Sequence, residues 1–367
     1  MTCQMSKGQL LFMGVSALTL CGLLMVYSAS MVATAQDGDP SHYFLRQASY
    51  AGIGYLLMIL LMFVDYRRWL KKRTIILLIV LSVTCLIIVY AQSSVKGAHR
   101  AIHLGQLISF QPSEIAKLVL FFYLASFLET KRDEIKQSIS RLLPCVAVLG
   151  LFSVLIGFEP DLGQVIGIVL IAIALFFIAG LDWKYIWMAA VLSVPAFCLF
   201  VWQVPFRRKR VLDWLIALRD PLKADYQIKQ AIIGIGHGGL LGLGFGEGQQ
   251  KLSFVPEAPT DFIYSVIGEE FGLAGSLLIV AVFLGYLYLG IKISLKAPDS
   301  GGFYLGLAIT LMVVLPAFIN MSTALALMPT KGLTLPFISR GGSSLLVSLM
   351  ATGILLNIAS QQTTNED

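Results

Sequence analysis

Long apolar runs alternate with polar connections along this chain, and the lengths of the apolar runs predict its fold. A helix needs about 20 apolar residues to cross a hydrocarbon core about 30 Å thick. Ten runs approach this length, which predicts an all-α polytopic membrane protein with a single membrane domain over residues 1–367. The predicted spans are residues 9–33, 44–64, 74–91, 112–129, 142–158, 162–180, 185–204, 261–291, 302–326 and 341–360.

One polar connection, residues 205–260, is far longer than the others and lies between the seventh and eighth predicted spans. It opens with a basic cluster, continues into a glycine-rich tract and ends at a proline-containing turn before Asp261, so we expect most of the polar chemistry here. No separable soluble domain is indicated, and the polar tail 361–367 is predicted to be disordered. The basic cluster consists of Arg207, Arg208, Lys209 and Arg210.

The composition agrees with a membrane protein, because 57% of the residues are hydrophobic and only 13% are charged, against about 25% charged in soluble domains. The net charge of +6 therefore indicates loop asymmetry and lipid headgroup contact, and we expect no nucleic-acid partner. The five cysteines show no paired spacing, which argues against a disulfide framework or a zinc site. The first apolar run is too long for a cleavable signal peptide, and further spans follow it.

Lysine and arginine predict the orientation, since cytoplasmic loops carry an excess of these residues. With the N-terminus inside, 13 basic residues fall on inner segments and five fall on the short outer loops. The long connection is discounted, because long loops cross the membrane largely regardless of charge. Both termini are therefore predicted to be cytoplasmic, and residues 205–260 extracytoplasmic.

Asp261 is the leading candidate for chemistry, at the outer edge of the eighth predicted span. One interpretation is structural, because an acid at a helix N-terminus caps the helix and is favoured by its dipole. The other is functional. A carboxylate at the membrane–water boundary, beside Glu257 and facing a polar loop, can have a pKa suited to general-base work. The residues alone leave both interpretations open.

Glu114 and Lys117 lie one helical turn apart at the start of the fourth predicted span and share one helix face. Charges in a membrane helix face protein or an aqueous cavity, so we expect an ion pair that either clamps helices or lines a cavity. Glu159 and Asp161 fall in a tight outer turn. They are either solvated hairpin residues or, more weakly supported, ligands for a divalent cation.

Glu269 and Glu270 lie about two turns inside the eighth predicted span and must point inward, in a structural or cavity role. They stand between Gly268 and Gly272, whose spacing predicts close helix packing. The connection 331–344, rich in glycine, proline and serine, could cradle a phosphate or sugar or simply pack as a plug.

Two other patterns carry little weight. His99 and His103 have a spacing that would suit a metal in a helix, but no third ligand accompanies them. Gly234, Gly236 and Gly239 match the dinucleotide-binding pattern by letter only, because no strand precedes them. We expect these glycines to let a re-entrant or surface segment approach another backbone.

Short motifs follow one another along essentially the whole chain: Gln111-Pro112-Ser113-Glu114-Ile115-Ala116-Lys117, Glu159-Pro160-Asp161-Leu162-Gly163, Asp220-Pro221-Leu222, Tyr226-Gln227, His237-Gly238-Gly239-Leu240, Pro256-Glu257-Ala258, Thr260-Asp261-Phe262-Ile263, Gly268-Glu269-Glu270-Phe271-Gly272 and Gly341-Gly342-Ser343-Ser344. Together they resemble the SEDS family (shape, elongation, division and sporulation), the RodA/FtsW membrane glycosyltransferases. Residues 327–336 and 249–252 are more similar to the cell-division branch, FtsW, than to the elongation branch, RodA.

The resemblance implies a peptidoglycan glycosyltransferase of the bacterial cytoplasmic membrane that polymerises lipid II into glycan strands at the outer face, for septal wall synthesis. It implies a class B penicillin-binding protein and other division-complex membrane proteins as partners. It also implies that Asp261 is catalytic, that Glu114 and Lys117 form a cavity-shaping salt bridge, and that a divalent cation (Mg²⁺ or Mn²⁺) takes part at a site no motif locates.

Candidate substrate contacts extend this interpretation. The leaving pyrophosphate needs cationic stabilisation, for which the arginines of the long connection and of the last loop are candidates. The cavity candidates are Glu114, Lys117, Arg100, Glu257, Asp161, Lys331, Ser343 and Ser344, and the pyrophosphate candidates are Arg207, Arg208, Arg210 and Arg340.

The chain departs from the family pattern at Pro259, Arg340 and Ala101, where histidine, tyrosine and tryptophan are usual. Because Asp261 is retained, we expect these departures to alter substrate contacts and not to remove the catalytic acid. Two rival functions stay open. A lipid II flippase would need essential residues on a path to both faces, whereas the motifs cluster outside. A non-catalytic scaffold for the transpeptidase would tolerate replacement of Asp261.

Overall fold

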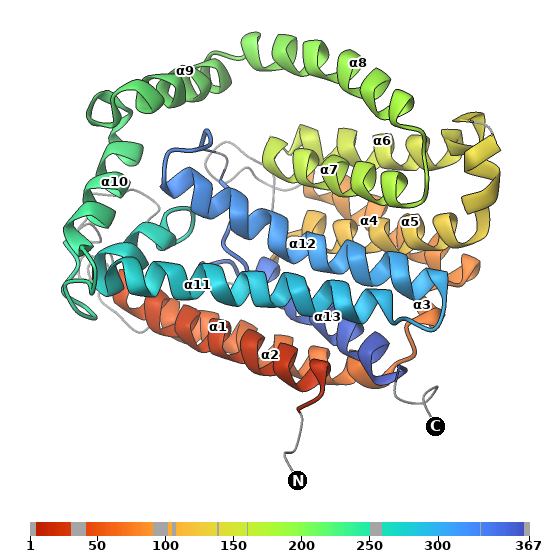
Figure 1. Ribbon diagram of the computed structural model, residues 1–367, viewed down its shortest axis with the longest axis horizontal. Helices are drawn as coiled ribbons and strands as arrows, with labels where there is room; N and C mark the ends of the chain where they lie inside the picture. Colours follow the sequence, from red (N-terminus) through yellow and green to blue (C-terminus); the bar gives the residue numbers. More distant parts are fainter. Residues whose placement is uncertain are drawn as a thin grey trace.

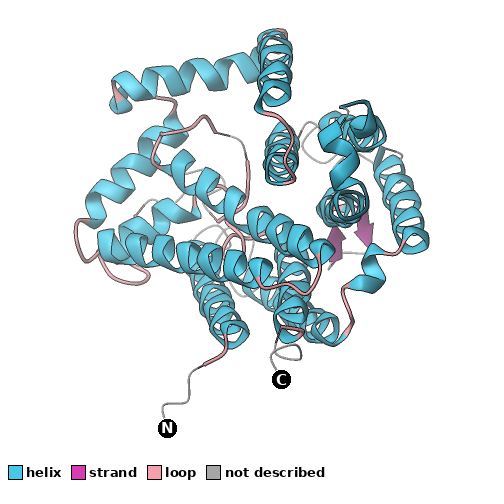
Figure 2. Cartoon of the chain, turned by 45° about the vertical axis from the view of Figure 1, so that its right-hand side comes forward, coloured by secondary structure: helices cyan, strands magenta, loops and turns pink. Residues whose placement is uncertain are grey.

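The structure is a computed structural model that describes residues 5–30, 42–90, 102–104, 108–137, 139–159, 161–249, 259–330 and 332–362. Helices make up nearly all of the described chain (Figure 2). Ten of these helices correspond to the predicted spans, although α5 continues further than expected. They are α1 (Lys7–Ser30), α2 (His42–Phe63), α4 (Lys72–Tyr90), α5 (Pro112–Gln137), α6 (Leu143–Phe158), α7 (Leu162–Ile178), α8 (Trp183–Trp202), α11 (Ile263–Leu295), α12 (Ser300–Ala324) and α13 (Gly342–Ser360).

Seven helices of the described chain are long and apolar enough to cross a membrane, and α7 is a shorter apolar helix. Helix α5 is less apolar because it carries Glu114, Lys117 and Glu129 along its length. The protein is therefore a helical, multi-pass membrane protein. Among the seven, α12 and α13 are the most buried, and they form the centre of the bundle between α2, α5, α7 and α11 (Figure 1).

One part of the described structure differs from the all-α prediction. Strands β1 (Ile102–Leu104) and β2 (Ile108–Phe110) form an antiparallel hairpin where the sequence indicated only an outer loop. His103 therefore lies in a strand, so the helical spacing required for a histidine metal pair is not present; His99 lies outside the described residues. Short apolar runs such as these strands carry too weak a signal to be recognised without their partner.

The long connection is also more regular than expected, because much of it is helical. It contains α9 (Pro205–Arg219), the 3₁₀ turn η2 (Pro221–Lys223) and α10 (Tyr226–Gly238), which follow α8 as an arc outside the bundle (Figure 1). The criterion of about 20 apolar residues detects membrane length, so it misses short polar helices. Two further short helices, α3 (Arg67–Leu70) and η1 (Ile139–Leu142), connect spans.

Helix α11 is interrupted at Gly272, whose φ of 64° and ψ of −160° are not helical. The glycine-rich segment after α10 replaces the lost helical hydrogen bonds, which is what a break at membrane depth requires. The close approach to the α11 backbone is made at Gly238 and Gly242, whereas a Cβ at Gly236 or Gly239, two of the glycines for which it was expected, would meet nothing within 4 Å. The Leu273 and Ala274 amides donate to the Gly239 and Leu240 carbonyls, and the Leu243 and Gly244 amides donate to the Glu269 and Glu270 carbonyls.

Glu269 and Glu270 are buried beside this break, as predicted. The hydroxyl of Ser28 on α1 donates to Glu270 Oε1 at 2.6 Å, and the Gln249 amide donates to Glu269 Oε1 at 2.9 Å. A charge inside a membrane protein needs such partners, because an unpaired one is costly to bury. The two acids therefore connect α1, α11 and the glycine-rich segment.

Substitutions at Gly242 and Gly246 test the contact between the glycine-rich segment and α11. Both residues have a φ of +84°, but of the two only Gly242 touches α11. A Cβ at Gly242 would overlap the Glu270 carbonyl, whereas a Cβ at Gly246 would meet nothing within 4 Å. We expect Gly246→Ala to cost about 1–2 kcal/mol of stability from backbone strain. Gly242→Ala should cost a further 1–3 kcal/mol, roughly, from overpacking. Thermal unfolding of the two variants in detergent measures the difference, and equal losses would contradict the contact.

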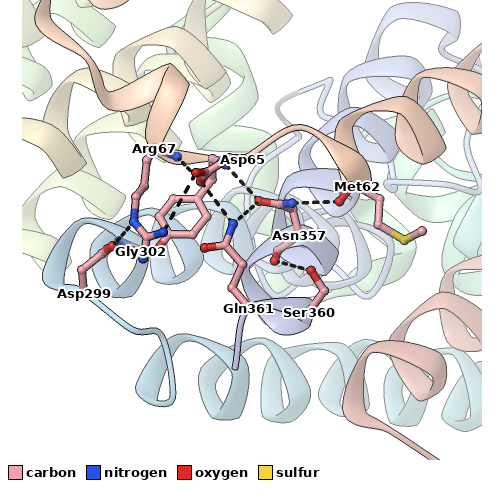
Figure 3. Close-up of polar contacts among 9 residues, drawn as sticks. Met62, Asp65, Arg67, Asp299, Gly302, Asn357, Ser360 and Gln361 are labelled. Atoms are coloured by element: carbon pink, nitrogen blue, oxygen red, sulfur yellow. Dashed lines mark hydrogen bonds and ion pairs between the residues drawn. The ribbon is translucent and has the colours of Figure 1, made fainter. Parts of the chain in front are cut away.

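A polar cluster fastens the end of the bundle where α12 begins (Figure 3). Asp299 is the N-cap of α12 and accepts a hydrogen bond from Arg67 Nε at 2.7 Å, while Asn357 on α13 donates to the Met62 carbonyl at 2.8 Å. Burial alone would raise the pKa of Asp299, but hydrogen bonds from the backbone, Tyr66 and Arg67 outweigh it and hold the pKa below its usual value.

Both ends of the described chain lie at this cluster. Gly8 at the start of α1 lies against Leu356 and Ala359 near the end of α13. Gln361 donates to Asp65 at 3.1 Å, so the first residue of the predicted disordered tail is in fact held in place. Residues 363–367 lie outside the described residues.

Candidate active site

A cavity of about 230 Å³ lies where the first turns of α5, α7 and α13 meet the connection between α12 and α13. The end of β2 and the middle of α12 complete its wall. Pro316, which has no N–H, removes one backbone hydrogen bond of α12 there. The polar part of the lining consists of Ser109, Gln111, Glu114, Lys117, Asp161, Gln164, Thr334, Ser343, Ser344 and Ser348.

Glu114 and Lys117 form the predicted ion pair on the cavity wall. Lys117 Nζ lies 2.9 Å from Glu114 Oε2, and their side chains are 13% and 8% exposed. The other Glu114 oxygen accepts a hydrogen bond from Gln164 Nε2 at 2.9 Å. Asp161 caps α7 by accepting from the Gln164 backbone N–H at 3.2 Å, so Asp161 joins the Glu114–Lys117 pair through Gln164.

Ser343 and Ser344 hold the start of α13 beside the start of α5 and the connection between α12 and α13. The Ser343 hydroxyl accepts a hydrogen bond from the Gln111 amide at 2.9 Å. The Ser344 hydroxyl accepts one from the Thr334 hydroxyl at 3.0 Å. Both serines lie where the sequence analysis placed them, on the cavity.

Three helices, α5, α7 and α13, begin at this cavity. The N-terminus of a helix carries a partial positive charge and unpaired amide hydrogens, which makes it a site for anions. Their convergence beside Lys117 adds positive potential to a cavity wall that also carries the carboxylates of Glu114 and Asp161.

Asp261 lies in a second, much smaller cavity of about 10 Å³, which is room for about one water molecule. Arg210 and Gln227 line it from the long connection. Gly332 and Leu333 line both cavities, so Asp261 is adjacent to the large cavity and separated from it by this short segment. Gly332 has a φ of 65°, and a Cβ there would come within 3.3 Å of Asp261 Oδ2.

The boundary of α11 bears on the two interpretations of Asp261. Helix α11 begins at Ile263, and Phe262 occupies its N-cap position without a side-chain cap hydrogen bond. Asp261 therefore lies in a turn, one residue before the N-cap, and is not itself the N-cap residue of α11.

Of the four arginines proposed for pyrophosphate, the structure brings Arg210 to the small cavity. The guanidinium of Arg340 lies over the Tyr43 ring at 4.3 Å, and Arg207 and Arg208 lie at the start of α9 and line neither cavity. The remaining candidates Arg100, Glu257 and Lys331, and the departure at Ala101, lie outside the described residues.

Several cavity residues were missed by the sequence analysis. Asn320 had a usable signal, because a polar amide inside an apolar span needs a buried partner. Gln164 stands three residues after the capping acid Asp161, a position whose side chain often joins a cap network. Gln227 belongs to the Tyr226-Gln227 motif and Thr334 to the connection 331–344, but neither was singled out as a site residue, and Ser109 carried no signal of its own.

Comparisons with known proteins show the family of this chain. Residues 8–364 match the family model described as cell cycle protein, FtsW/RodA/SpoVE. The chain is 39% identical over 348 residues to the probable peptidoglycan glycosyltransferase FtsW of Geobacter sp. strain M18, covering 94% of each chain. It is also similar to the Rod shape determining protein RodA of Thermus thermophilus, with 26% identity, a TM-score of 0.71 and coverage of 96% of each chain. A chain of a peptidoglycan synthase complex, reported for its coordination of polymerization and crosslinking, matches with 26% identity and a TM-score of 0.76, over 96% of this chain and 97% of that chain.

Proposed function

We propose, from the premise that this chain belongs to the FtsW/RodA/SpoVE family, that it is a peptidoglycan glycosyltransferase of septal wall synthesis with Asp261 as its catalytic residue. The observation that carries the proposal is the adjacency of two cavities. One holds a carboxylate and an arginine, and the other is ringed by three helix N-termini and Lys117. Such a pair of sites suits a substrate with a reacting sugar and a pyrophosphate.

Lipid II is the substrate that fits this description, because it joins a polyprenyl tail to a pyrophosphate and a disaccharide. In the proposed step, Asp261 takes the proton from the acceptor sugar's 4-hydroxyl while that oxygen attacks the donor's anomeric carbon. The anomeric carbon–phosphate oxygen bond breaks, and the lipid pyrophosphate leaves with the bonding electrons. Arg210, Lys117 and the helix N-termini stabilise the charge that develops on it.

A divalent cation remains part of the proposal. No three His, Cys, Asp or Glu side chains of the described segments come together as a metal site. Magnesium is commonly held by one or two carboxylates together with substrate phosphates, so the residues present fit a cation that arrives with pyrophosphate. Asp161 is the cavity carboxylate we propose for it, and when bound the cation would offset negative charge on the pyrophosphate.

We further propose that a class B penicillin-binding protein is the partner, which the similarity to a chain of a peptidoglycan synthase complex supports. The ten-span topology is proposed on the ten helices that correspond to the predicted spans and on the similarity to RodA. Both termini would face the cytoplasm, since this orientation puts 13 basic residues on inner segments and five on the short outer loops.

Cysteine labelling tests this orientation. Lys223 in the long connection and Lys184 in the first turn of α8 have side chains that are 78% and 66% exposed. In a variant with the native cysteines replaced, Lys223→Cys should react with an impermeant maleimide added to intact cells, and Lys184→Cys should react only after permeabilisation. The reverse pattern would contradict the proposed topology.

Reconstitution tests the function itself. The purified protein in liposomes, with lipid II, Mg²⁺ or Mn²⁺ and its transpeptidase partner, should produce glycan polymer, and a chelator should lower the yield. Movement of lipid II across the bilayer without polymer would favour the flippase. Polymer that also forms with Asp261→Asn would favour the scaffold or another catalytic residue.

A further inference from the structure

We infer that Asn320 and Ser339 are positioning residues that fix the backbone of the turn carrying Asp261. The inference rests on the proposed catalytic role of that carboxylate. It concerns residues that neither the family motifs above nor the candidate list contains.

Three consecutive carbonyl groups of the turn accept hydrogen bonds from residues far away in the sequence. The Pro259 carbonyl accepts from the Arg340 amide at 2.8 Å. The Thr260 carbonyl accepts from the Ser339 hydroxyl at 2.6 Å, and the Asp261 carbonyl accepts from Asn320 Nδ2 at 2.9 Å. Each residue of the turn is thus tied separately, which leaves its backbone little freedom to rotate.

Asn320 acts as a clamp between two segments. Its amide nitrogen also donates to the Leu333 carbonyl at 2.6 Å, so both amide hydrogens are used on carbonyl oxygens. Since carbonyls only accept, this pair of partners assigns the amide orientation without ambiguity. Asn320 therefore couples the Asp261 turn to the segment that separates the two cavities.

The carbonyl oxygen of the Asn320 side chain takes no part in this clamp. Asn320 is 2% exposed, and its Oδ1 is buried without a hydrogen-bond partner among the described residues. The contacts that Asn320 makes are therefore the two hydrogen bonds from its amide nitrogen to the Asp261 and Leu333 carbonyls.

Ser339 repeats the arrangement on the other side of the turn. While its hydroxyl donates to Thr260, it accepts from the Leu335 amide at 2.8 Å. Gln47 on α2 in turn donates to the Ser339 carbonyl at 3.1 Å, which fixes the serine to the bundle. The Asp261 turn is therefore anchored to α12 through Asn320 and to α2 through Ser339.

Asn320→Asp tests the inference, because it keeps the shape and removes both donors. We expect kcat for polymerisation to fall by about 100-fold, as misplacement of a reacting group by about 1 Å can do. KM for lipid II should stay within about twofold, because Asn320 does not line the large cavity. Asn357→Asp is the matched control, since Asn357 is also buried and donates to a carbonyl at 2.8 Å at the other end of the bundle. It should lose thermal stability without the selective loss of kcat.

Ser339→Ala and Ser339→Thr supply a second test that does not depend on Asn320. The alanine variant should show the same fall in kcat at constant KM, and threonine, which keeps the hydroxyl, should restore part of it. In the background of Asp261→Asn, Asn320→Asp should cause little further loss, because the two changes act on one group.

The outcomes separate the two ideas. Full activity of Asp261→Asn would defeat the proposed function. An inactive Asp261→Asn beside normal kcat in Asn320→Asp and Ser339→Ala would overturn the inference alone. Equal losses in Asn320→Asp and Asn357→Asp, matched by equal thermal destabilisation, would also overturn it.

Discussion

Replacing Asp261 with asparagine is expected to abolish glycan polymerisation while leaving membrane insertion and partner binding intact. The change keeps the shape and most hydrogen-bonding capacity of the side chain but removes its charge and its ability to accept a proton. Loss of a general base typically lowers the rate by about 10²–10⁴-fold. Polymer length and yield from lipid II in proteoliposomes measure this directly.

The same substitution separates catalysis from helix capping. Asparagine and aspartate cap helices about equally well, so a capping role would survive the change with little loss. The turn itself is held through backbone carbonyls, which the substitution does not alter. An unchanged melting temperature together with lost polymerisation supports the catalytic role. Substantial polymer from the asparagine variant would count against it.

Removing one member of the Glu114–Lys117 pair is expected to be more damaging than removing both. In Glu114→Ala the Lys117 ammonium, 13% exposed, loses its carboxylate, and the Gln164 amide loses its acceptor. Breaking a buried pair in this way typically costs about 3–5 kcal/mol. The double replacement by alanine leaves no lone charge and should recover part of that stability. Thermal unfolding and expression level measure both variants.

An exposed ion pair of the same chain provides the control. Asp182 and Lys184 lie 3.2 Å apart with side chains 63% and 66% exposed, so Asp182→Ala should change stability by less than about 1 kcal/mol. A double Glu114/Lys117 variant that is less stable than Glu114→Ala would show that the pair does not act as a unit. A large loss in Asp182→Ala would show that exposure does not govern the difference.

The membrane helices were predictable because the signal for them is local. A span is a run of apolar residues of nearly constant length, set by bilayer thickness rather than by neighbouring segments. The buried charges were predictable for the same reason, since acids such as Glu114 and Glu269 inside apolar runs must find partners wherever the fold places them. The partner that lies one turn away, Lys117 for Glu114, was predictable from the spacing, whereas partners on distant segments were not.

The elements that were missed depend on contacts between distant segments. Strands β1 and β2 are stabilised by the hydrogen bonds that each makes with the other. The break at Gly272 exists because residues 239–244 supply the hydrogen bonds that α11 gives up. No local pattern indicates that Ser28 meets Glu270 or that Gln164 meets Glu114, since 242 and 50 residues separate the members of these pairs.

The sequence by itself determined the membrane class, the approximate positions of ten helices and the acids that must be buried, because each follows from the cost of placing a polar group in hydrocarbon. It also contained the motifs that identify the family. Only the tertiary structure decided that three helix N-termini converge on one cavity, that Arg210 alone of the four proposed arginines reaches the described cavity of Asp261, and that Asn320 holds the turn. These are contacts between segments that packing brings together. The order of residues along the chain does not indicate which distant residues lie close to one another in the folded protein.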